Sequence, residues 1–171
     1  MPATLAAQAR IAPVSEPGEP LVIRGTVFAA TGRPAAGVIV YAYQTDAHGL
    51  YPPDPGGSGR PSVRHGRLRG WARTDAAGEY RFDTIRPAGY PGTGIPQHVH
   101  MHVIEPGRCT YYLDDLLFDD DPRLTATARE NHDHGRGGRG IAVPTKGSDG
   151  IWSVRRDIRL GENIPGYPAI P

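Results

Sequence analysis

Apolar residues recur at every second position in several short segments, which is the pattern of β-strands with one buried face. Turn residues separate these segments, so 21–28 with 38–44, and the stretch from Trp71 with 79–85, are predicted to form hairpins. Alanine and leucine favour a short helix within 121–130. The predicted strands are 21–28 (LVIRGTVF), 38–44 (VIVYAYQ), 79–85 (EYRFDTI), 97–105 (QHVHMHVIE), 110–118 (TYYLDDLLF) and 153–161 (SVRRDIRLG).

Short strands at regular spacing predict an all-β fold, a β-sandwich of mixed short strands with little helix. Residues 20–161 would form this domain, after an irregular arm at 1–19 and before an extended tail at 162–171. The tail could lie on its own domain or on a neighbour. Two long Pro/Gly-rich segments, 50–70 and 86–96, interrupt the strands, and such loops in compact domains are usually functional.

Composition excludes several classes of function. The chain of 171 residues has a net charge of +1, so no nucleic-acid or membrane partner is expected. Its one cysteine, Cys109, rules out a disulfide within the chain and a cysteine-based zinc site. The N-terminus lacks a charged start followed by a long apolar run, so we expect no secretory leader and a cytoplasmic location.

The segment PQHVHMHVIEP, residues 96–106, combines a strand pattern with candidate metal ligands. His98, His100 and His102 alternate with three apolar residues, so imidazoles share one face while the other face belongs to the core. Histidines at i and i+2 can bind one metal from the same face of a strand. The plainer interpretation is exposed histidines, or core histidines satisfied by hydrogen bonds.

Two histidines do not complete a metal site, and the long loops contain the other candidates. Tyr51 and Tyr90 each precede a proline, which holds the tyrosine in extended backbone. Taken alone, each tyrosine would be a packing or surface residue. A phenol with a pKa near 10 binds a metal at neutral pH only when a hard Lewis acid such as Fe(III) lowers that pKa.

Together these motifs resemble the intradiol ring-cleavage dioxygenases, most closely the protocatechuate 3,4-dioxygenase branch. The resemblance covers about residues 20–161. It implies an Fe(III) site formed by Tyr51, Tyr90, His98 and His100, and a catechol-type substrate that is cleaved by O2 between its hydroxyls to a cis,cis-muconate-type product. It further implies that Tyr90 leaves the metal and takes up a substrate proton, and that the chain self-associates. The matching segments are LVIRGTVFAATGRPAAGVIVYAYQTDAHGLY, TDAAGEYRFDTIRPAGYP, PQHVH, LLFDDDP and RRDIRLG.

Two positions depart from the family pattern. Ile95 stands where the family usually has an arginine, and Asp115 where it usually has a glutamine. Because both family residues face the substrate, these changes predict a substrate other than protocatechuate. Asp115 could be a general base or an exposed residue, and the additional histidine, His102, could support the site or be a plain strand residue.

Arginines follow the first tyrosine, and a Gly/Arg segment lies at 132–140. The arginines would form a solvated surface, or one of them would pair with a substrate carboxylate. The segment 132–140 would be a surface loop or a lid. The arginines are Arg60, Arg64, Arg67, Arg69 and Arg73.

Two other interpretations remain at this stage. The spacing Gly92-x5-His98-x-His100-x4-Glu105 fits the first metal motif of a cupin, which would use Glu105 as a ligand and neither tyrosine. Alternatively, the segments around 25–42 and 74–85 resemble pre-albumin-like β-sandwich modules. Such modules bind or act as spacers and have no metal chemistry.

Overall fold

The computed structural model describes residues 1–53 and 65–168. Arg60 and Arg64 lie outside the described residues, as does the middle of the predicted loop 50–70. The elements are β1 (Gln8–Arg10), β2 (Pro20–Phe28), β3 (Ile39–Gln44), β4 (Arg69–Arg73), β5 (Glu79–Ile85), β6 (His98–Glu105), β7 (Cys109–Tyr112), β8 (Leu116–Phe118), α1 (Ala126–His132), β9 (Ile141–Ala142), β10 (Thr145–Lys146), β11 (Trp152–Arg155) and β12 (Ile158–Arg159).

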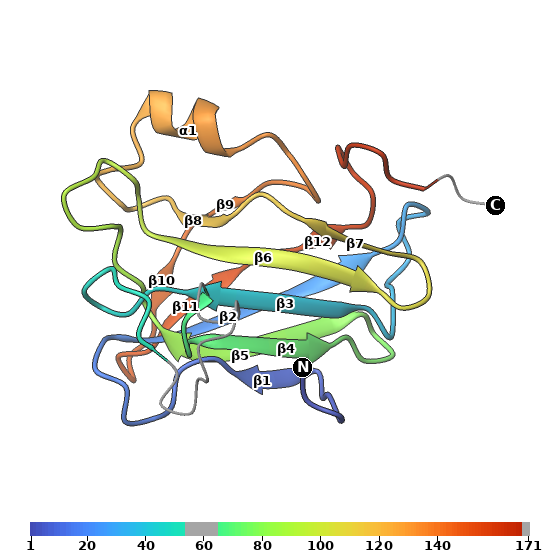
Figure 1. Ribbon diagram of the computed structural model, residues 1–171, viewed down its shortest axis with the longest axis horizontal. Helices are drawn as coiled ribbons and strands as arrows, with labels where there is room; N and C mark the ends of the chain where they lie inside the picture. The colour runs from blue at the N-terminus through green and yellow to red at the C-terminus, as the bar shows by residue number, and fades with distance from the viewer. Residues whose placement is uncertain (54–64, 169–171) are drawn as a thin grey trace.

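The strands form two six-stranded sheets, and the fold is the predicted all-β sandwich (Figure 1). The first sheet has the order β1-β5-β2-β11-β10, with β12 also paired to β2. The second has the order β4-β3-β6-β8-β9, with β7 also paired to β6. Both sheets mix parallel and antiparallel pairs, for example β1 with β5 and β2 with β5. The histidine strand β6 therefore lies in the middle of its sheet.

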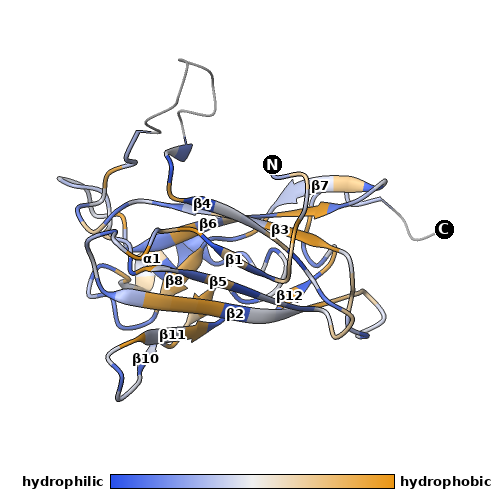
Figure 2. Ribbon diagram, turned by 90° about the horizontal axis from the view of Figure 1, so that it is seen from below, coloured by the Kyte–Doolittle hydropathy of each residue, from blue (hydrophilic) through white to orange (hydrophobic). Residues whose placement is uncertain are grey.

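The core lies between the sheets and is built from alternate residues of the long strands. Ile23 and Phe82 are paired across β2 and β5 and are fully buried. Ala42 and Met101 are paired across β3 and β6 and are buried equally well. Strands β2 and β3, one from each sheet, carry long hydrophobic stretches (orange in Figure 2). Burial of these apolar faces fixes the second face of each strand, including that of β6, on the outside of the sandwich.

The predicted hairpins are wrong. Strands β2 and β3 lie in different sheets, and so do β4 and β5, so each turn crosses from one sheet to the other. Hairpins and crossover connections both show an apolar run, a turn and a second apolar run, so this sequence pattern does not distinguish them. The partner of β2 is instead β5, which is distant in the chain.

The segments predicted as an arm and a tail both contact the sandwich. Within 1–19, β1 pairs with β5, and Ile11 and Ala12 are buried in the core. Near the other end, Tyr167 Oη donates to Glu105 Oε1 at 2.8 Å, which holds residues up to 168 on the domain. The helix forms a few residues later than predicted, and no described helix is long and apolar enough to cross a membrane.

A β-bulge divides the predicted strand 110–118. His102 is opposite Tyr112 and Val99 is opposite Leu116, so three steps along β6 correspond to four steps along its partner. The extra residue separates β7 from β8, and bulges commonly re-aim side chains beside functional sites. Because Leu116 faces the core, the bulge leaves Asp115 on the outer face beside the histidines.

Candidate metal centre and active site

The two tyrosine loops are joined directly to each other. Ala88 N donates to Asp46 O at 3.0 Å, and Thr45 Oγ1 donates to Ala88 O at 2.7 Å. Gly49 has a φ of +80°, and a Cβ there would lie 2.3 Å from the carbonyl oxygen of Gly89. Only glycine allows this close approach. The packing of one loop on the other brings Tyr51 and Tyr90 together, and their hydroxyl oxygens are 2.7 Å apart.

Both histidines direct Nε2 at the hydroxyl of Tyr90. His98 Nδ1 is 2.8 Å from Pro96 O, and His100 Nδ1 is 2.8 Å from Asp115 Oδ1. Because carbonyl and carboxylate oxygens only accept hydrogen bonds, each Nδ1 is the donor, and in the neutral imidazole each Nε2 then presents a lone pair. Burial lowers the pKa of His98, which favours this neutral form.

Three of the four predicted ligand atoms converge on one point, and the fourth, Tyr51 Oη, lies next to Tyr90 Oη. Tyr90 Oη lies 3.2 Å from the Nε2 atoms of both His98 and His100, and these two nitrogens are 3.2 Å apart. Ligands bound at about 2.0–2.2 Å around one ion are separated by roughly 3 Å, so a single metal ion fits among them. The structure brings together all four residues that the resemblance implied.

The chemistry of the donor atoms fits a hard trivalent cation. Two imidazole lone pairs face one phenol hydroxyl, whose single proton can satisfy only one of them. Burial and the hydrogen bond with Tyr90 raise the pKa of Tyr51 above its ordinary value, so its phenolate needs a strong positive charge nearby. A ferric ion would convert both phenols into phenolates and use both lone pairs.

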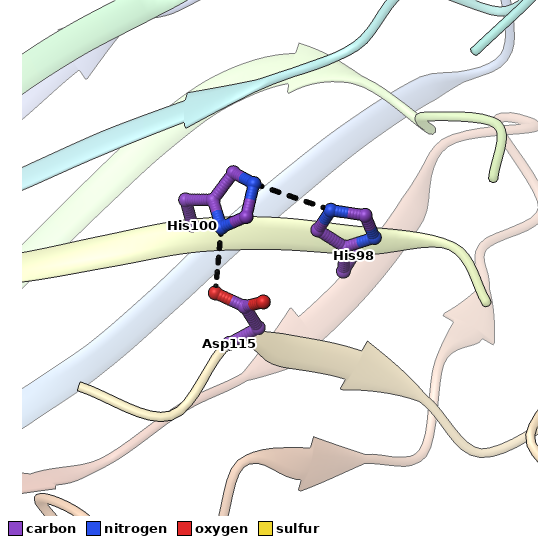
Figure 3. Close-up of side chains that lie close together, drawn as sticks. All are labelled: His98, His100 and Asp115. Atoms are coloured by element: carbon purple, nitrogen blue, oxygen red, sulfur yellow. Dashed lines mark hydrogen bonds and ion pairs between the residues drawn. The ribbon is translucent and has the colours of Figure 1, made fainter. Parts of the chain in front are cut away.

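Asp115 supports His100 from the side opposite Nε2 (Figure 3). Tyr112 Oη also contacts His100 Nδ1, at 2.5 Å, and it donates a short hydrogen bond to Asp115. Burial would raise the pKa of Asp115, but hydrogen bonds from His100 and Tyr112 outweigh this effect and lower it. Although His98, His100 and Asp115 could bind an ion as a group, the carboxylate contacts Nδ1 and is better placed to orient the imidazole.

A cavity of about 140 Å³ opens beside these ligands. Ile95 lines it, so the departure from the family pattern faces the site. One further lining residue, His132, comes from the end of α1 and was not predicted from the sequence. The complete lining is Tyr90, Ile95, Pro96, His98, His100, Asp115, Leu117 and His132.

His102 lies away from the cavity. Its ring packs edge-on against Tyr112 at 4.7 Å, and its Nε2 is buried without a hydrogen-bond partner among the described residues. Burial lowers the pKa of His102 to about 4, so the ring is neutral at pH 7. A catalytic role for His102 therefore stays a prediction, and its packing suits a structural role.

Other aromatic residues on the outer face were also missed by the sequence reasoning. Strand pairing places Tyr43 opposite His100, with ring centroids 4.6 Å apart. Tyr43 also stacks on His65 at 3.8 Å. The tyrosines of segment 38–44 alternate with buried residues, and this alternation was the sequence signal that could have placed them on the outer face.

Among the arginines, Arg67 is paired with Glu16 and is engaged in a structural contact.

The cupin alternative is wrong. Glu105 is at the opposite end of β6 and on its core-facing side, where it is buried. It accepts hydrogen bonds from Tyr111 Oη at 2.9 Å and from Tyr167 Oη at 2.8 Å. Glu105 is seven steps along the strand from His98, which corresponds to roughly 23 Å. It cannot bind the ion that the histidines bind.

Comparisons with known proteins agree with this site. A family model described as "Dioxygenase" matches residues 3–132. Catechol 1,2-dioxygenase 1 of Acinetobacter lwoffii is 38% identical over 49% of this chain and 27% of its own length. The protocatechuate 3,4-dioxygenase beta chain of Burkholderia cepacia is 30% identical over 63% of this chain and 48% of its own length. The chain thus spans between about a quarter and a half of these relatives.

A solved structure covers nearly the whole chain. The dioxygenase domain of a dioxygenase and carbohydrate-binding fusion protein from Streptomyces sp. SirexAA-E superimposes with a TM-score of 0.70 and 26% identity. The match covers 94% of this chain and 91% of that domain. The segments with the four converging side chains therefore belong to a fold that occurs as a separate domain.

Proposed function

Because this chain belongs to the intradiol ring-cleavage dioxygenase family, we propose that it binds Fe(III) and cleaves a catechol-type ring between its two hydroxyls with O2. The observation that carries the proposal is the mutual contact of Tyr90, His98 and His100, with Tyr51 hydrogen-bonded to Tyr90. A metal-free binding or spacer module would have no reason to bury two phenols against two imidazole lone pairs. Self-association and a cytoplasmic location stay predictions.

The side chains divide the work at the site. If bound, Fe(III) would be chelated by the two oxygens of the substrate and would draw electron density from the ring, so that O2 reacts with the ring. Tyr90 lines the cavity and is the ligand within reach of a substrate, so its phenolate can take up one hydroxyl proton. Tyr51 does not line the cavity and stays a ligand. Asp115 and Pro96 O hold the two imidazoles with their Nε2 atoms toward the metal.

The cavity favours an uncharged ring over protocatechuate. Ile95, Pro96 and Leu117 form apolar walls, and the carboxylate of Asp115 adds a negative charge. A substrate carboxylate would meet that charge in a partly dehydrated space, which is unfavourable. The volume of about 140 Å³ is also below the roughly 300 Å³ of common small-molecule pockets, so we expect a single ring with small substituents.

Iron content, a visible spectrum and product analysis test the proposal. The protein as purified should contain iron and show the visible charge-transfer band of Fe(III) tyrosinates. Assays on a panel of catechols should give cis,cis-muconate-type products. Iron-loaded protein that gives only extradiol products, or none, would refute the activity. If protocatechuate were turned over as fast as any neutral catechol, the activity would stand and the proposed selectivity would be wrong.

A further inference from the structure

Helix α1 places His132 at a fixed position over the cavity. Thr125 Oγ1 caps the helix by accepting from Ala128 N at 3.2 Å, and Arg129 Nη1 donates to Asp119 Oδ1 at 2.6 Å. Ala128 packs on an apolar cluster beneath the helix, formed by Leu117, Leu124 and Ile141. The contacts of Ala128 and Arg129 tie the helix to the edge of the second sheet, where β8 and β9 lie (Figure 1). Its last residue, His132, is therefore part of the cavity wall.

His132 differs from the other residues that line the cavity in its hydrogen bonding. His98 and His100 direct Nε2 to the proposed metal position, and Ile95 and Leu117 contribute apolar wall. The His132 ring makes no hydrogen bond or ion pair with any residue in the ranges that the structure describes. An imidazole that borders a cavity without such a bond can both donate to a ligand and accept from one.

We propose that His132 is a specificity-determining residue that hydrogen-bonds a third hydroxyl on the ring of the substrate. The inference rests on the proposed function and names the substrate class, a trihydroxylated benzene. A hydroxyl fits better than a carboxylate because Asp115 borders the same small cavity. A hydroxyl fits better than a methyl group because a methyl would leave the imidazole of His132 without a partner.

Two ring probes of similar size test the hydrogen bond. They are 1,2,4-trihydroxybenzene and 4-methylcatechol, which differ by a hydroxyl in place of a methyl. The wild-type holoenzyme should prefer the first in kcat/KM. His132→Ala should reduce that preference roughly 3- to 10-fold, as expected for one neutral hydrogen bond. His132→Gln should retain most of it, since the amide also donates and accepts. The exposed histidine two positions later supplies the matched control, His134→Ala, which should keep the wild-type ratio.

Anaerobic titration of the visible band with each probe gives a dissociation constant and separates binding from turnover. The same change in ratio should appear there. An unchanged ratio in His132→Ala, an equal loss in His134→Ala, or no wild-type preference for the hydroxyl would overturn the inference while the dioxygenase activity stands. Absence of the iron band and of ring cleavage in the wild type would instead refute the proposed function, and the inference with it. If His132→Ala failed to fold, His132→Phe, which keeps a planar ring without hydrogen-bonding atoms, would take its place with the same expected loss of preference.

Discussion

Removal of the Asp115 carboxylate should weaken iron binding by a moderate amount that the structure allows us to work out. In Asp115→Ala, His100 Nδ1 loses a hydrogen bond of 2.8 Å to a charged acceptor but keeps its 2.5 Å contact with Tyr112 Oη. Hydrogen bonds to charged groups contribute about 1.5–3 kcal/mol and neutral ones about 0.5–1.5 kcal/mol. Tyr112, released from Asp115, can accept from Nδ1. The net loss is therefore about 1–1.5 kcal/mol, or roughly 5- to 12-fold in iron affinity.

A double variant removes the remaining support. In Asp115→Ala combined with Tyr112→Phe, nothing in the bulge holds His100 Nδ1. Iron affinity should then fall by about 10- to 100-fold, the range seen when the hydrogen-bond partner of a histidine ligand is lost. Asp115→Asn keeps an acceptor without the charge, so its iron affinity should lie between those of the wild type and Asp115→Ala.

Competition with a chelator, followed at the visible band, measures these affinities. The matched control is Glu105→Gln, which changes a carboxylate on β6 itself, at the end of the strand far from His98. It should lower stability, because Glu105 accepts from Tyr111 and Tyr167, but it should leave iron affinity unchanged. Iron affinity within twofold of wild type in the double variant would show that the carboxylate does not orient His100. An equal loss in Glu105→Gln would show that any damage to β6 has the same effect.

Three further predictions concern the metal and the stability of the sandwich. Tyr51→Phe removes one phenolate, so the visible band should bleach and iron content should fall; elemental analysis and an absorption spectrum check this. Arg156 is buried and donates to the carbonyl oxygens of residues 136, 137, 138 and 157, so Arg156→Met should lower the free energy of unfolding by about 3 kcal/mol or more in urea titrations. Burial would raise the pKa of Asp83, but hydrogen bonds from Gln8 and Arg81 lower it. The stabilisation from Asp83 should therefore be complete well above its unfolded pKa of about 4 and be lost as pH falls through its depressed pKa, so wild type and Asp83→Asn should differ in urea midpoint at pH 6 and converge once the pH is below that depressed pKa.

The sequence alone determined the sandwich and named the candidate ligands. Strand geometry forces alternate residues onto opposite faces, so HVHMH could only place Val99 and Met101 in the core and the histidines outside. The resemblance named four ligands, and the structure brings those four together. The cavity also includes Ile95 and Asp115, the two departures from the family pattern.

Tertiary structure decided how these parts meet, because each remaining feature depends on contacts between distant segments. Which strands are neighbours follows from the packing of two sheets, and the local pattern of β2 and β3 is the same for a hairpin and for a crossover. The bulge that turns Asp115 toward His100 exists only in the register of β6 against two partners. His132 reaches the cavity because α1 is tied to the sheet edge by contacts that no periodicity in its own segment reveals. A local pattern specifies which face a side chain takes, whereas long-range packing specifies what that side chain meets.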